Sequence, residues 1–308
     1  MELLTEYGIW KGARDVRYDS DGKLSQVFLV EPNAIKLPHG IATPLHSVQD
    51  SGRRRETPLL FHPNGKLKSL PLQDRVPIKT AMGTFPAELL TFHDSGELRK
   101  IFPSAGKLTG FWTEEHEYGE APVCEFTVGD TQIFAKIISI QFYPSGAVQA
   151  VTLWPEELLQ IQVPWGKATI RTGISFYEDG ALQSFEPASP TPVPSEIGTL
   201  MAYDSHPIGV SADKNSLYFA PDGQILSLLT MTSKIQVRTE VGEILNYSPQ
   251  TIASFCEEAD TELRPLRISF TSTTVLFGSD PKDEFPLLTS EFSINNSAVV
   301  LGAACCQG

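Results

Sequence analysis

The sequence predicts an all-β fold, an antiparallel array of β-hairpins that forms an extended meander or a solenoid-like sheet. Three observations favour it. A hairpin turn recurs six times, an aromatic residue stands at the same place before each turn, and a second series of turns alternates with the first.

The stretch from Ile140 to Val151 is the best example of the first turn. Pro144 presets φ for the first loop position, and Gly146 can take the left-handed conformation that closes a three-residue hairpin loop. Such a loop places the residue four before the glycine opposite the residue two after it, on one face of the ribbon.

All six turns follow this rule. The glycines are Gly22, Gly65, Gly96, Gly146, Gly180 and Gly223. Four residues before them stand Tyr18, Phe61, Phe92, Phe142, Phe176 and Phe219, and two residues after them stand Leu24, Leu67, Leu98, Val148, Leu182 and Ile225. The apolar residues five after each glycine are out of phase with this face, which predicts a β-bulge or a change of layer there.

A second kind of turn has an apolar residue five positions before its glycine. These glycines are Gly40, Gly83, Gly129, Gly166, Gly198 and Gly242, and five of them follow a first-type glycine by 18 to 20 residues. The repeat is therefore a double hairpin. Gly129 follows Gly96 by 33 residues, and we expect the intervening segment to add another hairpin.

From Ser248 onward the pattern breaks. Ser248 and Pro249 suit the start of a helix, and Ile252, Phe255 and Cys256 share one helical face. We expect a hairpin repeat domain over 1–248 and, over 249–308, a C-terminal cap or small appended β-rich unit that contains one short helix.

The composition of the chain limits the classes of partner that we expect. A formal charge of −13 argues against nucleic acid and against an anionic membrane. No run of 18 apolar residues and no secretory leader is present, so we expect a cytoplasmic protein. The four cysteines follow neither a metal-binding nor a disulfide spacing, and no cofactor or metal is expected.

The segments FHPNGKLKS, FYEDGALQS and FAPDGQILS resemble the MORN-like repeat of bacterial proteins, some of which are described as antitoxin-like. The resemblance covers the first hairpin of each unit. It implies an extended β-meander that acts as a scaffold or interaction surface, and it brings no catalytic residue.

The residue three before each first-type glycine should point away from the apolar face. The chain places His62, His93, Tyr143 and Tyr177 there. This set, called the strip below, would form a ladder on which a protein partner could dock. The alternative is an ordinary amphipathic outer face.

Two charged segments allow other chemistry. In TEEHEYGE, residues 113–120, either Glu115 with Glu117 or Glu114 with His116 could bind a cation or do acid–base work, and the alternative is a solvated loop. The run Arg53, Arg54 and Arg55 could hold an acidic partner, and the alternative is again a solvated loop.

Three further motifs favour no activity. The segment DSHP at 204–207 contains the residue types of a hydrolase triad but is predicted to be a turn. The segment AGKLT at 105–109 lacks the first glycine of a phosphate loop. The ending AACCQG matches a prenylation box poorly.

The main hypothesis is a non-catalytic repeat protein that presents an elongated β-sheet surface to another protein. Two alternatives are an enzyme that acts on a small polar or carbohydrate-like substrate, and a structural component of an assembly.

Overall fold

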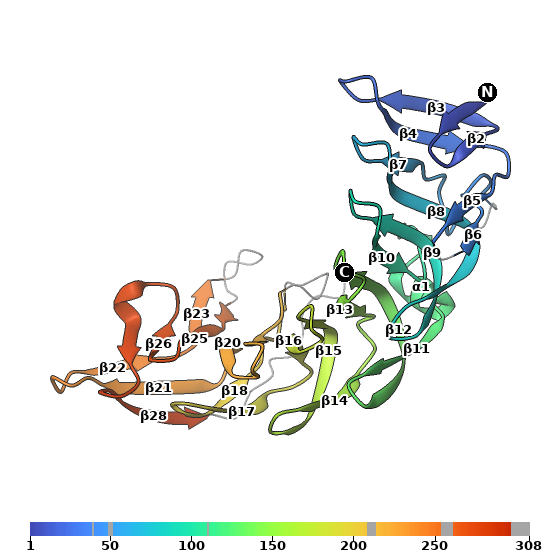
Figure 1. Cartoon of the computed structure of the whole chain (residues 1–308). Coiled ribbons are helices and arrows are strands. Elements are labelled where there is room, and N and C mark those ends of the chain that lie inside the picture. Colours follow the sequence, from blue (N-terminus) through green and yellow to red (C-terminus); the bar gives the residue numbers. More distant parts are fainter. Residues whose placement is uncertain (39, 49–51, 110, 208–213, 254–260, 297–308) are drawn as a thin grey trace. The chain divides into compact units, whose positions relative to one another are not determined.

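The computed structural model describes residues 1–38, 40–48, 52–109, 111–207, 214–253 and 261–296. In this part of the chain nearly all regular structure is antiparallel β-strand, which confirms the predicted hairpin array (Figure 1). No helix among these residues is long and apolar enough to cross a membrane.

The chain divides into two compact units. Unit 1 contains Met1–Leu159 and Ser175–Gly180, and unit 2 contains Gln160–Ile174 and Ala181–Gly308. The elements up to residue 159 are β1 (Leu3–Thr5), β2 (Gly8–Trp10), β3 (Ala13–Tyr18), β4 (Leu24–Leu29), β5 (Ile35–Leu37), β6 (Gly40–Ala42), β7 (Leu59–Phe61), β8 (Leu67–Lys79), β9 (Thr84–Phe92), β10 (Leu98–Phe102), α1 (Glu114–Glu120), β11 (Val123–Val128), β12 (Thr131–Phe142), β13 (Val148–Leu153) and the start of β14 (Leu159–Val163).

The later elements are β15 (Gly166–Phe176), β16 (Leu182–Pro187), β17 (Thr191–Ser195), β18 (Gly198–Ala202), β19 (Leu217–Phe219), β20 (Ile225–Thr230), β21 (Ser233–Arg238), β22 (Ile244–Tyr247), β23 (Gln250–Ala253), β24 (Thr261–Arg264), β25 (Leu266–Phe270), β26 (Thr274–Phe277), the 3-10 turn η1 (Pro281–Asp283), β27 (Glu284–Pro286) and β28 (Glu291–Asn296).

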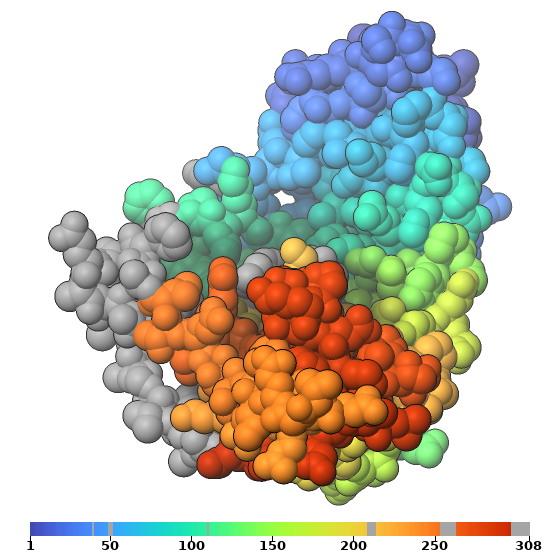
Figure 2. All heavy atoms as spheres, turned by 90° about the vertical axis from the view of Figure 1, so that its left-hand side faces the viewer, coloured from blue at the N-terminus to red at the C-terminus, as the bar shows by residue number. Residues whose placement is uncertain are grey.

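Unit 1 is built on a meander. Strands β3, β4, β7, β8, β9, β10, β12 and β13 each pair antiparallel with the next, and β11 pairs with the first half of β12. Figure 2 shows the successive segments of this unit stacked in chain order, from blue through cyan.

The predicted register is confirmed for five of the six first-type turns. Each aromatic residue faces the predicted aliphatic partner in the pairs Tyr18–Leu24, Phe61–Leu67, Phe92–Leu98, Phe142–Val148 and Phe219–Ile225. The six glycines have φ between 75° and 101°, which an L-residue adopts only with strain.

The predicted bulge is also present. The register shifts by one residue just after the aliphatic partner, as between Gln141 and Phe142. Ile140 then faces Val151, and Leu90 faces Ile101, so the residue five after the glycine returns to the apolar face. The bulge therefore keeps both strands of each hairpin in the core.

Three second-type turns, at Gly83, Gly129 and Gly166, lie at the other ends of strands that carry first-type turns, whereas Gly40, Gly198 and Gly242 lie in hairpins of separate small sheets. Gly65 closes the hairpin at the start of β8, and Gly83 follows the end of β8 and leads into β9. The double hairpin predicted from the spacing is thus one period of the meander at Gly83, and at Gly40, Gly198 and Gly242 its second hairpin forms a separate small sheet.

The aromatic residues form the core row of unit 1. Phe61, Phe92 and Phe142 are buried, each on a strand that has neighbours on both sides. Tyr18 is 55% exposed, because it lies on β3, whose pairing partner in the meander is β4 alone. A core position is thus buried only where a further hairpin covers it.

Unit 2 continues the hairpin pattern past residue 248. Strands β16, β19, β20, β25, β26 and β27 form a meander, and β21 pairs with both β22 and β28. The helix predicted after Ser248 is wrong at Gln250–Ala253, which is strand β23 paired with β24. The β-branched Thr251 and Ile252 and this pairing outweigh the helix-start signal. Residues 254–260 of the predicted helix lie outside the described residues.

Candidate functional site

The strip lies at the turn edge of unit 1, and its members join one turn to the next. His62 Nε2 lies 3.0 Å from the carbonyl oxygen of Phe92, and His93 Nε2 lies 3.0 Å from that of Phe142. Tyr143 donates its hydroxyl to the carbonyl of Phe176 at 3.0 Å. Tyr177 holds the same position in the turn that Gly180 closes, and all four side chains are half-buried.

These bonds give the strip a structural role. The acceptor is each time the core aromatic residue of the next hairpin, whose carbonyl points out of the turn. The three described bonds therefore hold four successive turns at a fixed separation. Partner binding by this row stays a prediction.

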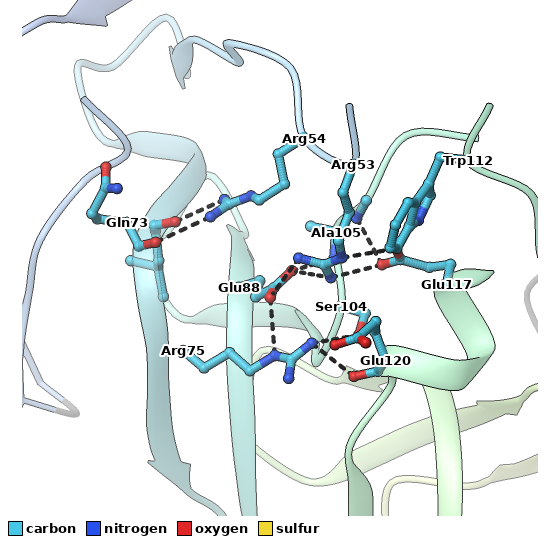
Figure 3. Close-up of polar contacts among 12 residues, drawn as sticks. Arg53, Arg54, Gln73, Arg75, Glu88, Ser104, Ala105, Trp112, Glu117 and Glu120 are labelled. Atoms are coloured by element: carbon cyan, nitrogen blue, oxygen red, sulfur yellow. Dashed lines mark hydrogen bonds and ion pairs between the residues drawn. The ribbon is translucent and has the colours of Figure 1, made fainter. Parts of the chain in front are cut away.

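A second site lies where two insertions meet the sheet. Arg53, from the segment between β6 and β7, lies between Glu88 of β9 and Glu117 of α1 (Figure 3). Its guanidinium donates to both oxygens of Glu88 at 3.0 and 2.8 Å and to both oxygens of Glu117 at 2.8 and 2.9 Å. Arg75 of β8 adds a bond of 2.9 Å to Glu88. We call Arg53, Arg75, Glu88 and Glu117 the carboxylate clamp.

The clamp is buried and fully hydrogen-bonded. The side chains of Glu88 and Glu117 are 7% and 4% exposed. Ala105 N donates to Glu88 at 2.8 Å, Gly106 N donates to Glu117 at 2.9 Å, and the indole of Trp112 donates to Glu117 at 2.6 Å. Each carboxylate oxygen therefore has at least one donor.

The electrostatics agree with an ion cluster that stays charged. Burial acts to raise the pKa of Glu88, but the hydrogen bonds from Arg53 and from Ala105 N outweigh it and hold that pKa below its usual range. Burial likewise acts to lower the pKa of Arg53, and its bonds to Glu88 and Glu117 outweigh that effect. A carboxylate held in this way is a poor proton donor or acceptor near neutral pH.

The solvated-loop interpretation of the arginine run is wrong for two of its three residues. Arg53 forms the clamp, and Arg54 donates to the carbonyls of Leu72 and Gln73 at 2.8 and 3.1 Å. Only Arg55 is exposed. The sequence carries no signal for this, because the partners of Arg53 lie 35 and 64 residues away.

Residues 113–120 are likewise not a loop, and the described residues of the segment 102–123 contain helix α1 in place of the expected additional hairpin. Helix α1 begins after Thr113, whose hydroxyl accepts from His116 N while the His116 ring bonds back to Thr113 N. Glu115 and His116 are exposed, and Glu117 is turned into the clamp. A capping box with histidine in place of the usual Glu or Gln was the missed signal.

The clamp holds an exposed hydrophobic pair. Phe111 is 94% exposed and Leu108 is 53% exposed. Lys107 N donates to the carbonyl of Arg53 at 2.7 Å, and Thr109 Oγ1 accepts from the backbone of Phe111 and Trp112 at 3.2 and 3.0 Å. We call Leu108 and Phe111 the apolar knob.

Two of the remaining motifs lie within the described residues. The backbone N–H groups of Ala105 and Gly106, in the segment compared with a phosphate loop, bind the clamp carboxylates. In DSHP, Asp204 Oδ1 accepts from His206 N at 3.0 Å, and the His206 ring contacts Ser205. The ending AACCQG lies outside the described residues.

Comparison with known proteins adds no assignment. No family model, no curated protein and no solved structure matches the chain. The resemblance to MORN-like repeats therefore stays a prediction.

Proposed function

We propose that this chain is a repeat protein that binds another protein, and that the apolar knob of unit 1 is its main contact. The observation that carries the proposal is Phe111, an aromatic side chain that is 94% exposed on a segment fastened by the carboxylate clamp.

The hydrogen bonds of the residues around Phe111 support binding. An exposed aromatic side chain gains free energy when a partner buries it, and aromatic anchors dominate many protein interfaces. Because Thr109 and Trp112 are already hydrogen-bonded on either side of Phe111, and Lys107 N is bonded to Arg53, the ordering cost of these residues on binding is small.

Charge indicates the kind of partner. Glu114 and Glu115 are exposed in the first turn of α1, just after the knob, and the whole chain carries a formal charge of −13. The partner that fits is a protein with an apolar pocket rimmed by lysine or arginine. The strip at the turn edge, where four turns are held in a row, is the second candidate contact on the same unit.

The test uses photo-crosslinking in cells that make the protein naturally. A benzoylphenylalanine at position 111 should give one protein adduct, and the same residue at Leu288, which is also 94% exposed but lies in unit 2, should not. The adduct is identified by mass spectrometry and the partner is purified.

Affinity measurements with the purified partner then test whether Phe111 is the main contact. Phe111→Ser should weaken binding of the purified partner by about tenfold or more, and Leu288→Ser should leave it unchanged. Equal adducts at both positions, or equal affinities of the two variants, would sink the proposal. The enzyme and assembly hypotheses stay predictions.

A further inference from the structure

A cavity of about 530 Å³ lies on unit 2. Its floor is the face of β19, β20 and β25 that carries Tyr218, Ser227 and Arg267. These residues alternate with the buried Leu217, Leu228 and Ile268, so the cavity lies on the side of the sheet opposite its core.

A buried carboxylate lines this cavity. Asp204 is 8% exposed, and its Oδ1 accepts from His206 N at 3.0 Å. Its Oδ2 makes no hydrogen bond with any residue that the structure describes. A carboxylate oxygen with an unused acceptor position at a cavity wall can accept a hydrogen bond from a charged donor of a ligand.

Two cations line the same cavity. Lys214 and Arg267 are exposed, and neither side chain forms an ion pair with another residue of the described ranges. The lining therefore contains one buried carboxylate and two exposed cations, which suits a ligand that carries both a positive and a negative group.

Hydrogen bonds to buried residues hold the polar residues that line the cavity in place. Asn215 is 3% exposed, and its amide nitrogen donates to Ser184 Oγ at 2.8 Å. Ser216 is 1% exposed and donates its N–H and its hydroxyl to Glu186 at 2.8 and 3.0 Å. Asn215 N donates to the hydroxyl of Tyr218 at 3.1 Å. This network pre-organises the cavity.

We propose that the cavity binds a small zwitterion, a molecule with one ammonium and one carboxylate group and the size of an amino acid or a dipeptide. Asp204 receives the ammonium, and Arg267 and Lys214 receive the carboxylate. The site uses no residue of the apolar knob, so it is independent of protein binding by unit 1.

The test is calorimetric titration of the full chain with four probes, namely glycylglycine, its N-acetyl derivative, its C-terminal amide and glucose. Glycylglycine should bind, and removal of either charge should weaken binding about tenfold or more. No heat with glycylglycine up to about 10 mM, or equal binding of glucose, would overturn the proposal.

Variants assign the two ends. Asp204→Asn should abolish the preference for glycylglycine over its N-acetyl derivative, whereas Arg267→Gln should abolish the preference over the amide. Arg264→Gln, an exposed arginine that does not line the cavity, is the matched control and should bind as the unmodified chain does.

The unfolding midpoint of Asp204→Asn is measured first. If Asp204→Asn does not fold, the proposal is tested with Arg267→Gln and Lys214→Gln only, by comparing their binding of glycylglycine and of its amide. A preference between the dipeptide and its amide that survives both changes contradicts the assigned site.

Discussion

At the scale of single residues, Arg53 has the largest expected effect on stability. Arg53→Met leaves Glu88 and Glu117 buried with part of their hydrogen bonds lost, and removal of one partner from a buried ion cluster costs about 3 to 5 kcal/mol. Urea denaturation measures the change. Arg55→Met, the same substitution at an exposed position two residues away, should stay within about 0.5 kcal/mol. Equal effects at the two positions would show that the clamp contributes nothing.

The contribution of Glu186 to the unfolding free energy should change with pH in the opposite direction from that of a carboxylate whose pKa is lowered in the folded state. Its side chain is fully buried, and burial raises its pKa to about 7, although Ser216 donates two hydrogen bonds and Arg171 lies 3.7 Å away. In the unfolded chain a glutamate titrates near about 4.3. Between these values the folded state keeps a proton that the unfolded state has lost, so this residue makes stability fall as pH rises through the window and level off above it.

Glu186→Gln should remove that component. The difference in unfolding free energy between the unmodified chain and the variant should change with pH from about 4.3 to about 7 and be flat outside this range. Glu240→Gln, at an exposed position, is the control with the same change of charge, and its difference should show no such slope. Denaturant curves at five pH values supply the measurement. Parallel curves for the two variants would contradict the assignment.

At the scale of elements, replacement of two different glycines by alanine should change the stability in opposite directions. Gly146 closes a hairpin at φ 87°, and a Cβ there would meet no atom within 4 Å, so Gly146→Ala costs about 1 to 2 kcal/mol through backbone strain alone. Gly119 lies inside α1 without a positive φ and with equal space, so Gly119→Ala should stabilise by up to about 1 kcal/mol. Thermal unfolding compares the two. The same sign for both would refute the conformational argument.

Some of the secondary structure could be predicted from the sequence and some could not. The turn register was predictable because each hairpin loop is local, and the position of Gly146 alone sets Phe142 against Val148. The bulge followed from the phase of Val151. Helix α1 was not predicted, because seven residues with a histidine in the capping box carry a weak local signal.

The sites were less predictable than the elements. The strip was placed on one row from its spacing, but its bonds to the carbonyls of Phe92, Phe142 and Phe176 depend on how one turn sits beside the next. The clamp joins three segments that are distant in sequence, and no periodicity links Arg53 to Glu117. Long-range polar contacts of this kind have no signature in a single sequence.

At the scale of the whole molecule, β3, the first strand of the unit 1 meander, bears on the assembly hypothesis. Strand β3 carries Arg14, Asp15 and Arg17, and its register shifts at Asp15, which has φ 49°. Charges and a bulge on an outer strand oppose pairing with a strand of another copy. Growth of an assembly through β3 is therefore disfavoured, and contacts between copies would have to use another surface.

The net charge of −13 predicts that salt stabilises the folded chain. Like charges are closer together in the folded state than in the unfolded state, and the Debye length falls from about 10 Å at 0.1 M salt to about 3 Å at 1 M. The unfolding free energy should therefore rise by on the order of 1 kcal/mol between low and high NaCl, as measured by urea denaturation.

A variant with Gln at four exposed acidic positions of unit 1, namely Glu2, Glu115, Asp130 and Glu156, has a charge of −13 + 4 = −9 and should show a shallower rise. Arg53→Met lowers the stability at every salt concentration because the clamp is buried. The change of its unfolding free energy with NaCl concentration should stay close to that of the unmodified chain. A fall in stability with salt would mean that exposed ion pairs, such as that of Arg14 with Glu56, outweigh the repulsion.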